Sequence, residues 1–150
     1  MRTVIERWAW VGAVVFGVVL AGSGLFMMKE ARDAHDDVRD ALAAEKIVSA
    51  EDADIPLAQV DSAAEAKAQA DVIQHHILET TGGKTYSEMA RDDPNRQLYL
   101  QAITLRTALM ESYLAFKVAD LVLGVGAIVA LLGLSQVVLG AYLGYMRRSG

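Results

Sequence analysis

The sequence predicts an all-α protein in which two transmembrane helices form a hairpin and extend into an extracytoplasmic helical bundle. Three observations predict this fold class. Residues 8–28 and 121–146 carry no charged side chain. Between them, apolar side chains recur at spacings of three and four, which is the period of one helical face. No segment alternates apolar and polar residues over the length of a strand.

Both uncharged segments are long enough to cross a bilayer. A helix of about 20 apolar residues spans a hydrocarbon core of about 30 Å, and the two segments have 21 and 26 residues. The first is also longer than the apolar stretch of a cleaved signal peptide, about 7–15 residues. We therefore expect a cytoplasmic tail and first span over 1–28, an acidic extracytoplasmic helical domain over 29–117, and a second span with a cytoplasmic tail over 118–150.

Charge predicts the orientation of the chain. The central segment carries ten basic and seventeen acidic residues, and its net negative charge argues against nucleic acid or anionic lipid as a partner. Loops longer than about 60 residues weigh little in the positive-inside rule, so the tails decide. Because the tails contain four arginines, we expect both termini in the cytoplasm of a multi-pass protein of the cell (plasma) membrane: Arg2, Arg7, Arg147 and Arg148.

The central segment itself predicts helices. The helical pattern that follows the first span fades near Ile47, and residues 49–60 form a connector without a period. Ser62 and Glu65 have the spacing of a capping box, which predicts a helix over 62–81. The apolar positions of this helix have the spacing of an a/d face: Ala63, Ala66, Ala70, Ile73 and Ile77.

Residues 82–85, Gly-Gly-Lys-Thr, resemble the end of a phosphate-binding loop. The pattern G-x-x-x-x-G-K-[ST] requires a glycine at position 78, which is Leu78, and a preceding strand, where a helix is expected. We therefore expect no nucleotide binding. Gly82 instead suits the end of a helix, and the spacing from Thr85 to Glu88 predicts a second capping box that begins a short helix over 85–91.

Asp93 and Pro94 have the residue types of an N-cap and a first helical position. They predict one continuous helix from about Pro94 through the second span. The expected apolar seam of its outer half again alternates spacings of four and three: Leu98, Ala102, Leu105, Leu109, Ser112 and Phe116.

The two spans carry small residues at helical spacing. Small side chains let helix backbones approach closely in lipid, so these faces would pack either the two spans together or a span against another chain. Gln136 is the strongly polar side chain of the second span, and an interhelical hydrogen bond, a ligand path and simple tolerance remain open for it. The predicted packing positions are Ala13, Gly17, Ala21, Gly126, Gly133, Gly140 and Gly144.

One helical face of the central segment could hold a divalent metal. Asp71, His75 and Glu79 are four residues apart. The alternative is a solvated polar face with ordinary i,i+4 pairs. His76 points about 100° away from His75 on a helix of 3.6 residues per turn, so the two do not share one ion easily.

Four motifs, "QADVI..H", "TGGKTY", "RDDP.R" and "LRTAL", lie within residues 66–126. In this stretch, about 40% of its length, the chain resembles small two-span membrane proteins of high-GC Gram-positive bacteria. Such proteins are mostly of unknown function, and some carry the label of an aromatic ring-opening dioxygenase. The resemblance implies the two-span architecture and the membrane compartment, and it supplies no catalytic residue.

These observations together predict a non-enzymatic accessory or scaffold subunit, or a homo-oligomer, that is embedded in the lipid bilayer and needs no cofactor. Its partners would be further copies or a larger membrane complex. The alternative is an extracytoplasmic ligand or metal sensor that uses the face over residues 71–79. The most distinctive groups for docking a partner are expected to be exposed: Lys84, Tyr86, Arg91 and Arg96.

Overall fold

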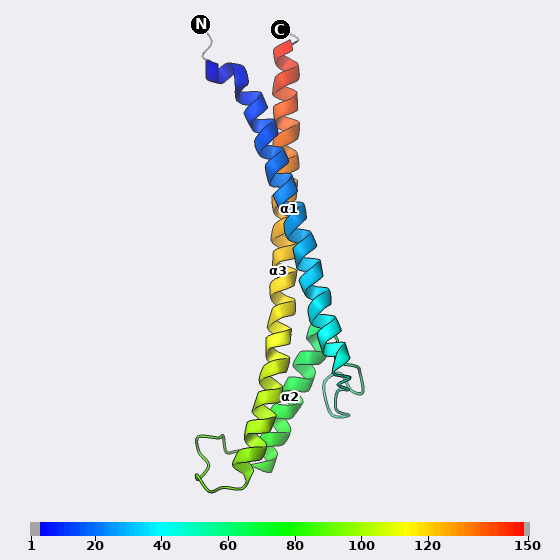
Figure 1. Ribbon diagram of the computed structural model, residues 1–150, viewed down its shortest axis with the longest axis vertical. Coiled ribbons are helices and arrows are strands. Elements are labelled where there is room, and N and C mark those ends of the chain that lie inside the picture. The colour runs from blue at the N-terminus through cyan, green and yellow to red at the C-terminus, as the bar shows by residue number, and fades with distance from the viewer. Residues whose placement is uncertain (1–3, 149–150) are drawn as a thin grey trace. The chain divides into compact units, whose positions relative to one another are not determined.

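The computed structural model describes the backbone of residues 4–148 and the side chains of residues 8–148. It contains three helices, α1 (Val4–Ala44), α2 (Ala63–Thr80) and α3 (Asn95–Arg148), and no strand within the described range (Figure 1). The predicted all-α fold class is therefore confirmed. A single antiparallel bridge between Val48 and Gln59 is the nearest approach to β-structure in the same range.

The chain forms two compact units. The paired-helix unit contains the α1 residues up to Ala34 and the α3 residues from Ala119 onward. The bundle unit comprises His35–Val118 and so contains the end of α1, all of α2 and the beginning of α3. Charge alone had predicted boundaries after residues 28 and 117.

The beginning of each later helix follows from a local signal. Ser62 has the extended backbone of an N-cap but makes no capping hydrogen bond to the backbone. Its hydroxyl group donates to the Glu65 carboxylate instead, so the predicted position is right and the predicted capping box is wrong. At α3, the Asp93 carboxylate accepts a hydrogen bond from the Asn95 N–H at 2.8 Å, as the Asp-Pro pair predicts.

The end of α2 is a Schellman motif. Gly82 and Gly83 have φ of 62° and 81°, in the left-handed region that suits glycine. The Gly83 N–H donates to the Leu78 carbonyl at 2.7 Å and the Gly82 N–H donates to the Glu79 carbonyl at 3.2 Å. This is the 6→1 and 5→2 pattern that satisfies the last carbonyls of a helix.

The predicted short helix over 85–91 is wrong. The segment makes one turn, in which the Glu88 N–H donates to the Thr85 carbonyl at 3.0 Å, and no helix is assigned there. The physical reason is Arg96, whose Nη1 donates to the carbonyls of Tyr86 at 3.0 Å and Met89 at 2.9 Å. In an α-helix the Tyr86 carbonyl would instead accept from the Ala90 N–H.

The core of the bundle unit lies between α2 and the outer halves of α1 and α3. The α2 seam is buried much as the spacing predicts, with Ala66 and Ala70 fully inaccessible. On α3 the predicted seam is only partly right, since Leu109 and Phe116 are buried whereas Leu98 and Leu105 are exposed. At the start of α3 the buried residue is Tyr99, one position from the prediction. A helix of 3.6 residues per turn drifts about 20° per heptad, which carries a strict 3-4 seam off its face.

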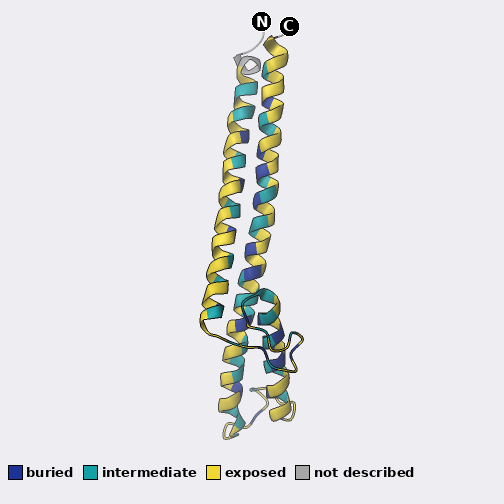
Figure 2. Cartoon of the chain, turned by 90° about the vertical axis from the view of Figure 1, so that its right-hand side faces the viewer, coloured by how far each residue is buried: buried dark blue, intermediate teal, exposed yellow. Residues whose placement is uncertain are grey.

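In the paired-helix unit, α1 and α3 run antiparallel (Figure 1). Figure 2 shows buried positions along the sides of these helices that face each other and exposed positions around the rest of their surface. Most of the buried positions recur every seven residues, which is the period of a coiled-coil seam. These are Gly17, Gly24 and Ala31 on α1, and Ala119, Gly126, Gly133 and Gly140 on α3, and Ala130, which meets the Gly24 position, is buried as well.

Candidate functional site

The paired-helix unit presents large apolar side chains to its surroundings. Helices α1 and α3 are each long and apolar enough to cross a membrane, and only 11% and 17% of their most apolar windows are buried inside the protein. The core helix of a soluble protein would be mostly buried. Side chains such as Phe26 (62% exposed), Leu131 (66%) and Val138 (68%) leave this apolar surface open on both helices.

Contact between the two helices is made by backbone. A Cβ atom added at Gly17 would lie 2.7 Å from the carbonyl oxygen of Gly133, and one at Gly24 would lie 2.5 Å from that of Gly126. Real Cβ atoms essentially never approach other heavy atoms this closely. The helix pair in this form therefore requires glycine at these positions.

The α3 side of the seam repeats the pattern. A Cβ atom at Gly133 would lie 2.6 Å from the Gly17 carbonyl oxygen, and one at Gly140 would lie 2.9 Å from the Trp10 carbonyl oxygen. A Cβ atom added at Gly144 would lie 3.0 Å from the Cε3 atom of the Trp10 indole ring. Close approach of this kind gains van der Waals contact along the whole pair. We call these facing small residues of α1 and α3 the glycine seam.

The structure places most of the predicted packing residues in the seam. Ala21 contacts the Gly133 position, whereas Ala13 is half-buried beside Val14, the residue that meets the Gly140 position. Sequence reasoning missed Gly24, which meets the backbone of Ala130. The spacing of seven from Gly17 to Gly24, repeated in α3, was the signal that could have found it.

Gln136 lies beside the seam and is half-buried. Its neighbour Val137 meets the Gly17 position, but the Gln136 amide group makes no hydrogen bond within the described part of the chain. The adjacent Ser135 is satisfied locally, because its hydroxyl donates to the Leu132 carbonyl at 2.8 Å. Within the described residues the Gln136 amide group therefore has no protein partner, and its surroundings are mostly apolar.

The predicted metal-binding face is occupied by pairs. Asp71 forms an ion pair with Lys67, and His75 Nε2 lies 3.2 Å from a Glu79 carboxylate oxygen. Among the described residues, no group of three His, Asp or Glu side chains is placed to hold a metal ion. His76 does not contact this face but hydrogen-bonds to the loop after α1, where its Nε2 lies 2.6 Å from Asp52 Oδ2.

The basic loop after α2 is partly built into the fold. Lys84 and Arg91 are exposed as expected. Tyr86 and Arg96 are half-buried, and the expectation of exposure is wrong for them. The Arg96 guanidinium carbon lies 3.8 Å from the centre of the Tyr86 ring, and the Tyr86 and Tyr99 rings are 6.4 Å apart. A cation over an aromatic face, with two carbonyl acceptors, fixes this loop onto the start of α3.

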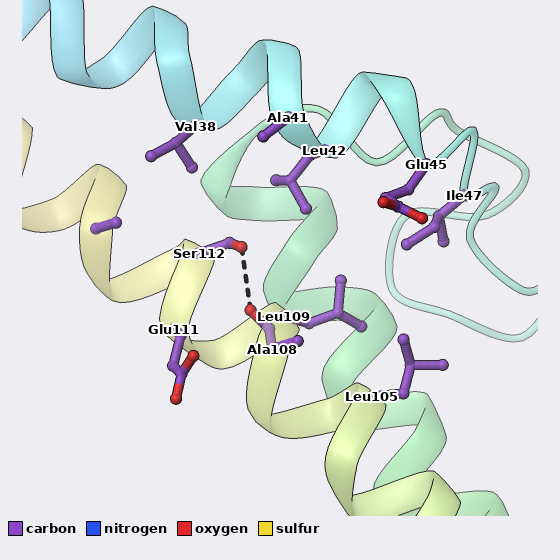
Figure 3. Close-up of a pocket in the computed structure, with 11 residues that line it drawn as sticks. Val38, Ala41, Leu42, Glu45, Ile47, Leu105, Ala108, Leu109, Glu111 and Ser112 are labelled. Carbon is purple, nitrogen blue, oxygen red and sulfur yellow. Dashed lines mark hydrogen bonds between the residues drawn. The ribbon is translucent and has the colours of Figure 1, made fainter.

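The bundle unit has an open apolar groove between α1 and α3 (Figure 3). Its volume is about 590 Å³, and its lining is mostly alanine, leucine and valine from the two helices. Glu45 and Glu111 are its charged lining residues. The Ser112 hydroxyl in the groove donates to the Ala108 carbonyl at 3.0 Å, so it offers no free donor. This lining can accept an apolar surface.

A smaller polar hollow of about 210 Å³ lies between α2 and the loop after α1. Asp52, Asp54, Asp71 and His75 contribute to its lining. The hydrogen bond from His76 lowers the pKa of the Asp52 carboxyl group, which keeps this carboxylate charged. The acidic side chains that line this hollow would favour cations over anions.

Comparison with protein-family models, curated proteins and solved structures gives no match for this chain. The class of protein is therefore inferred from the two apolar helices, the glycine seam and the polar contacts described above.

Proposed function

We propose that this protein is an integral membrane protein that crosses the bilayer twice and acts as a non-enzymatic accessory or scaffold subunit. The observation that carries the proposal is the apolar surface of the paired-helix unit. Soluble monomers rarely expose a contiguous apolar patch larger than a few hundred Å². Lipid is the solvent that makes such a surface favourable, and an α-helix satisfies its own backbone hydrogen bonds there.

The scaffold role is supported by how the described polar side chains are used. Arg96 fixes a loop, and the Gln69 side chain accepts a hydrogen bond from the Ala50 N–H at 2.9 Å, which holds a second loop to α2. These groups hold the chain to itself. The exposed surfaces of the bundle unit include an apolar groove, basic side chains after α2 and many carboxylates, and the groove suits contact with another protein.

The orientation we propose places both termini in the cytoplasm and the bundle unit outside the cell. Because the chain has no cysteine, single cysteines report position cleanly. Ser87 is exposed and suits the labelled variant Ser87→Cys, whereas Val60 is fully buried and would stay unlabelled on either side. Ser149→Cys in the C-terminal tail is the matched control.

We expect alkaline carbonate to leave the protein in the membrane pellet. In intact cells an impermeant maleimide should label Ser87→Cys, and Ser149→Cys only after permeabilisation. Release by carbonate would refute the membrane proposal, and the reverse labelling pattern would invert the topology.

The scaffold role is tested separately by extraction in mild detergent followed by native mass spectrometry. We expect a complex that contains more than one polypeptide chain. A lone monomer at every protein concentration would contradict the role of accessory subunit or homo-oligomer, while leaving the membrane assignment intact.

A further inference from the structure

We propose that two copies of this chain associate in the membrane through the face of α3 that carries Gln136, with the two Gln136 amide groups hydrogen-bonded to each other. This inference rests on the proposed membrane insertion. It adds an interface and a partner, a second copy of the chain, to the proposed scaffold role.

Gln136 has no hydrogen-bond partner within the described residues. A side-chain amide has two N–H donors and a carbonyl acceptor, and within the described residues none of these groups is hydrogen-bonded. In water this would be unimportant, because Gln136 is only half-buried. In the hydrocarbon core no water replaces the missing bonds, and each unsatisfied polar group costs several kcal/mol.

Gln136 lies deep within its expected membrane span. Val137, next to Gln136, meets the Gly17 position. Gly17 lies near the middle of the uncharged segment 8–28, and Gln136 lies well inside the segment 121–146. The amide group is therefore far from either end of its span, and a short side chain cannot reach the aqueous surface from there. Its hydrogen bonds must come from protein.

A second copy of the chain can supply the hydrogen bonds that Gln136 lacks. All copies of the chain insert with the same orientation, so Gln136 of every copy lies at the same depth. An amide group is self-complementary, since it donates and accepts, and a two-fold axis along the membrane normal brings two of them together. Interhelical hydrogen bonds from glutamine stabilise helix association in membranes. A different membrane protein would need its own polar group at the matching depth, whereas a second copy supplies it automatically.

The surface around Gln136 can accommodate such a contact. Leu132 and Leu139 lie on the same side of α3, one turn away in each direction, and are 56% and 49% exposed. Val138 lies two positions from Gln136, about 200° around the helix, and is 68% exposed. The proposal therefore predicts contact between copies at Leu132 and Leu139 and lipid at Val138.

Single-cysteine variants of the full chain in native membranes test this geometry. We expect oxidation to give disulfide-linked dimers from Leu132→Cys and Leu139→Cys and no dimer from Val138→Cys, although Val138 lies between the other two along α3 and is the most exposed of the three. Equal cross-linking at all three positions, or at Val138 alone, would overturn the proposed face.

The hydrogen bond is tested with Gln136→Leu and Gln136→Asn in lipid vesicles, with self-association followed by energy transfer between labelled copies. We expect Gln136→Leu to weaken the dimer roughly tenfold, within the range measured for interhelical hydrogen bonds in membranes. Gln136→Asn, which keeps the amide group, should retain most of the association. Leucine suits lipid, so Gln136→Leu should still insert, and carbonate extraction of each variant checks this.

Each outcome is decisive. Unchanged association of Gln136→Leu, or a wild-type chain that stays monomeric in vesicles, refutes the dimer while leaving membrane insertion standing. Loss of a different co-purifying protein from Gln136→Leu, without any dimer of the wild type, refutes the second copy as the partner. Failure of the wild type to remain in carbonate-washed membranes refutes the proposed function first.

Discussion

Ser49 shows how a single residue can organise a segment whose sequence predicts no regular structure. Its side chain is buried, and its hydroxyl group donates to the Ile55 carbonyl at 2.5 Å and accepts from the Ala58 N–H at 2.9 Å. The Ser49 N–H also donates to the Ala58 carbonyl at 2.9 Å. The connector expected over residues 49–60 is thus an ordered loop closed around one hydroxyl group. Sequence reasoning could not find it, because both acceptors lie six or more residues away.

Ser49→Ala should destabilise the bundle unit by about 1–3 kcal/mol, since the half-buried Ala58 N–H would lose its side-chain acceptor. Thermal unfolding of the full chain in detergent, followed by circular dichroism, measures the effect. Ser87→Ala is the matched control, because Ser87 is exposed and its hydroxyl contacts only that of Thr85. A Ser49→Ala midpoint equal to that of the control would contradict the role of this hydroxyl group.

The contact between Asp52 and His76 makes a second prediction, about pH. The hydrogen bond from His76 lowers the pKa of Asp52 in the folded protein. A lowered carboxyl pKa stabilises the fold above the unfolded value, about 3.9 for Asp, and this stabilisation is lost as pH falls through the folded value. Carboxyl-carbon NMR of the full chain should show Asp52 titrating below the ordinary range, and His76→Ala should raise its pKa toward that range. An Asp52 pKa unchanged by His76→Ala would contradict the hydrogen bond between these two side chains.

At the scale of the helix, the ends that depend on adjacent residues could be predicted from the sequence. Asp93 begins α3 and Gly82 ends α2, as their residue types indicate. The absence of a short helix over 85–91 could not be predicted in this way, because Arg96, which donates to the carbonyls of Tyr86 and Met89, comes from α3. The predicted exposure of Arg96 and Tyr86 was wrong for the same reason, because nothing in the sequence indicates that these two side chains stack together.

The faces of α3 show a similar limit. The alternating spacing of three and four correctly predicted that Leu109 and Phe116 are buried. It also predicted burial of Leu98 and Leu105, which are exposed. In the glycine seam the strict spacing of seven holds along both helices, since there each helix faces a single antiparallel partner. Periodicity therefore predicts a face well where one helix meets one partner, and less well where α3 packs against more than one element.

The seam makes a prediction that two glycines of one helix can test. Gly24→Ala should separate α1 from α3 and destabilise the pair by about 1–3 kcal/mol, the usual cost of overpacking. Gly22→Ala should be neutral or slightly stabilising, because a Cβ atom there meets nothing within 4 Å. Unfolding by a denaturing detergent compares the two variants directly. Equal stability of Gly22→Ala and Gly24→Ala would show that the backbones do not approach as closely as described.

At the scale of the whole molecule, the two units use different physics. The bundle unit buries apolar side chains such as Phe116 and Val60 in a small core, which requires water outside it. The paired-helix unit buries mainly glycine and alanine and exposes its large apolar side chains, so its association depends on close backbone contact in lipid. The charge distribution agrees with this division, since 27 of the 33 charged residues lie in 29–117.

Because the units depend on different solvents, they should unfold separately. Urea weakens hydrophobic burial and solvates exposed peptide groups, whereas helices in lipid keep their backbone hydrogen bonds away from it. In full-length protein in lipid nanodiscs, the amide groups of α2 should therefore lose their protection from hydrogen exchange at moderate urea. Those of the paired-helix unit should keep it. Ser49→Ala should lower the midpoint of this transition and Gly24→Ala should leave it unchanged, as measured by hydrogen exchange resolved to peptides. A single transition that both variants shift equally would mean that one cooperative unit spans the chain, and would refute the assignment of separate solvents to its two parts.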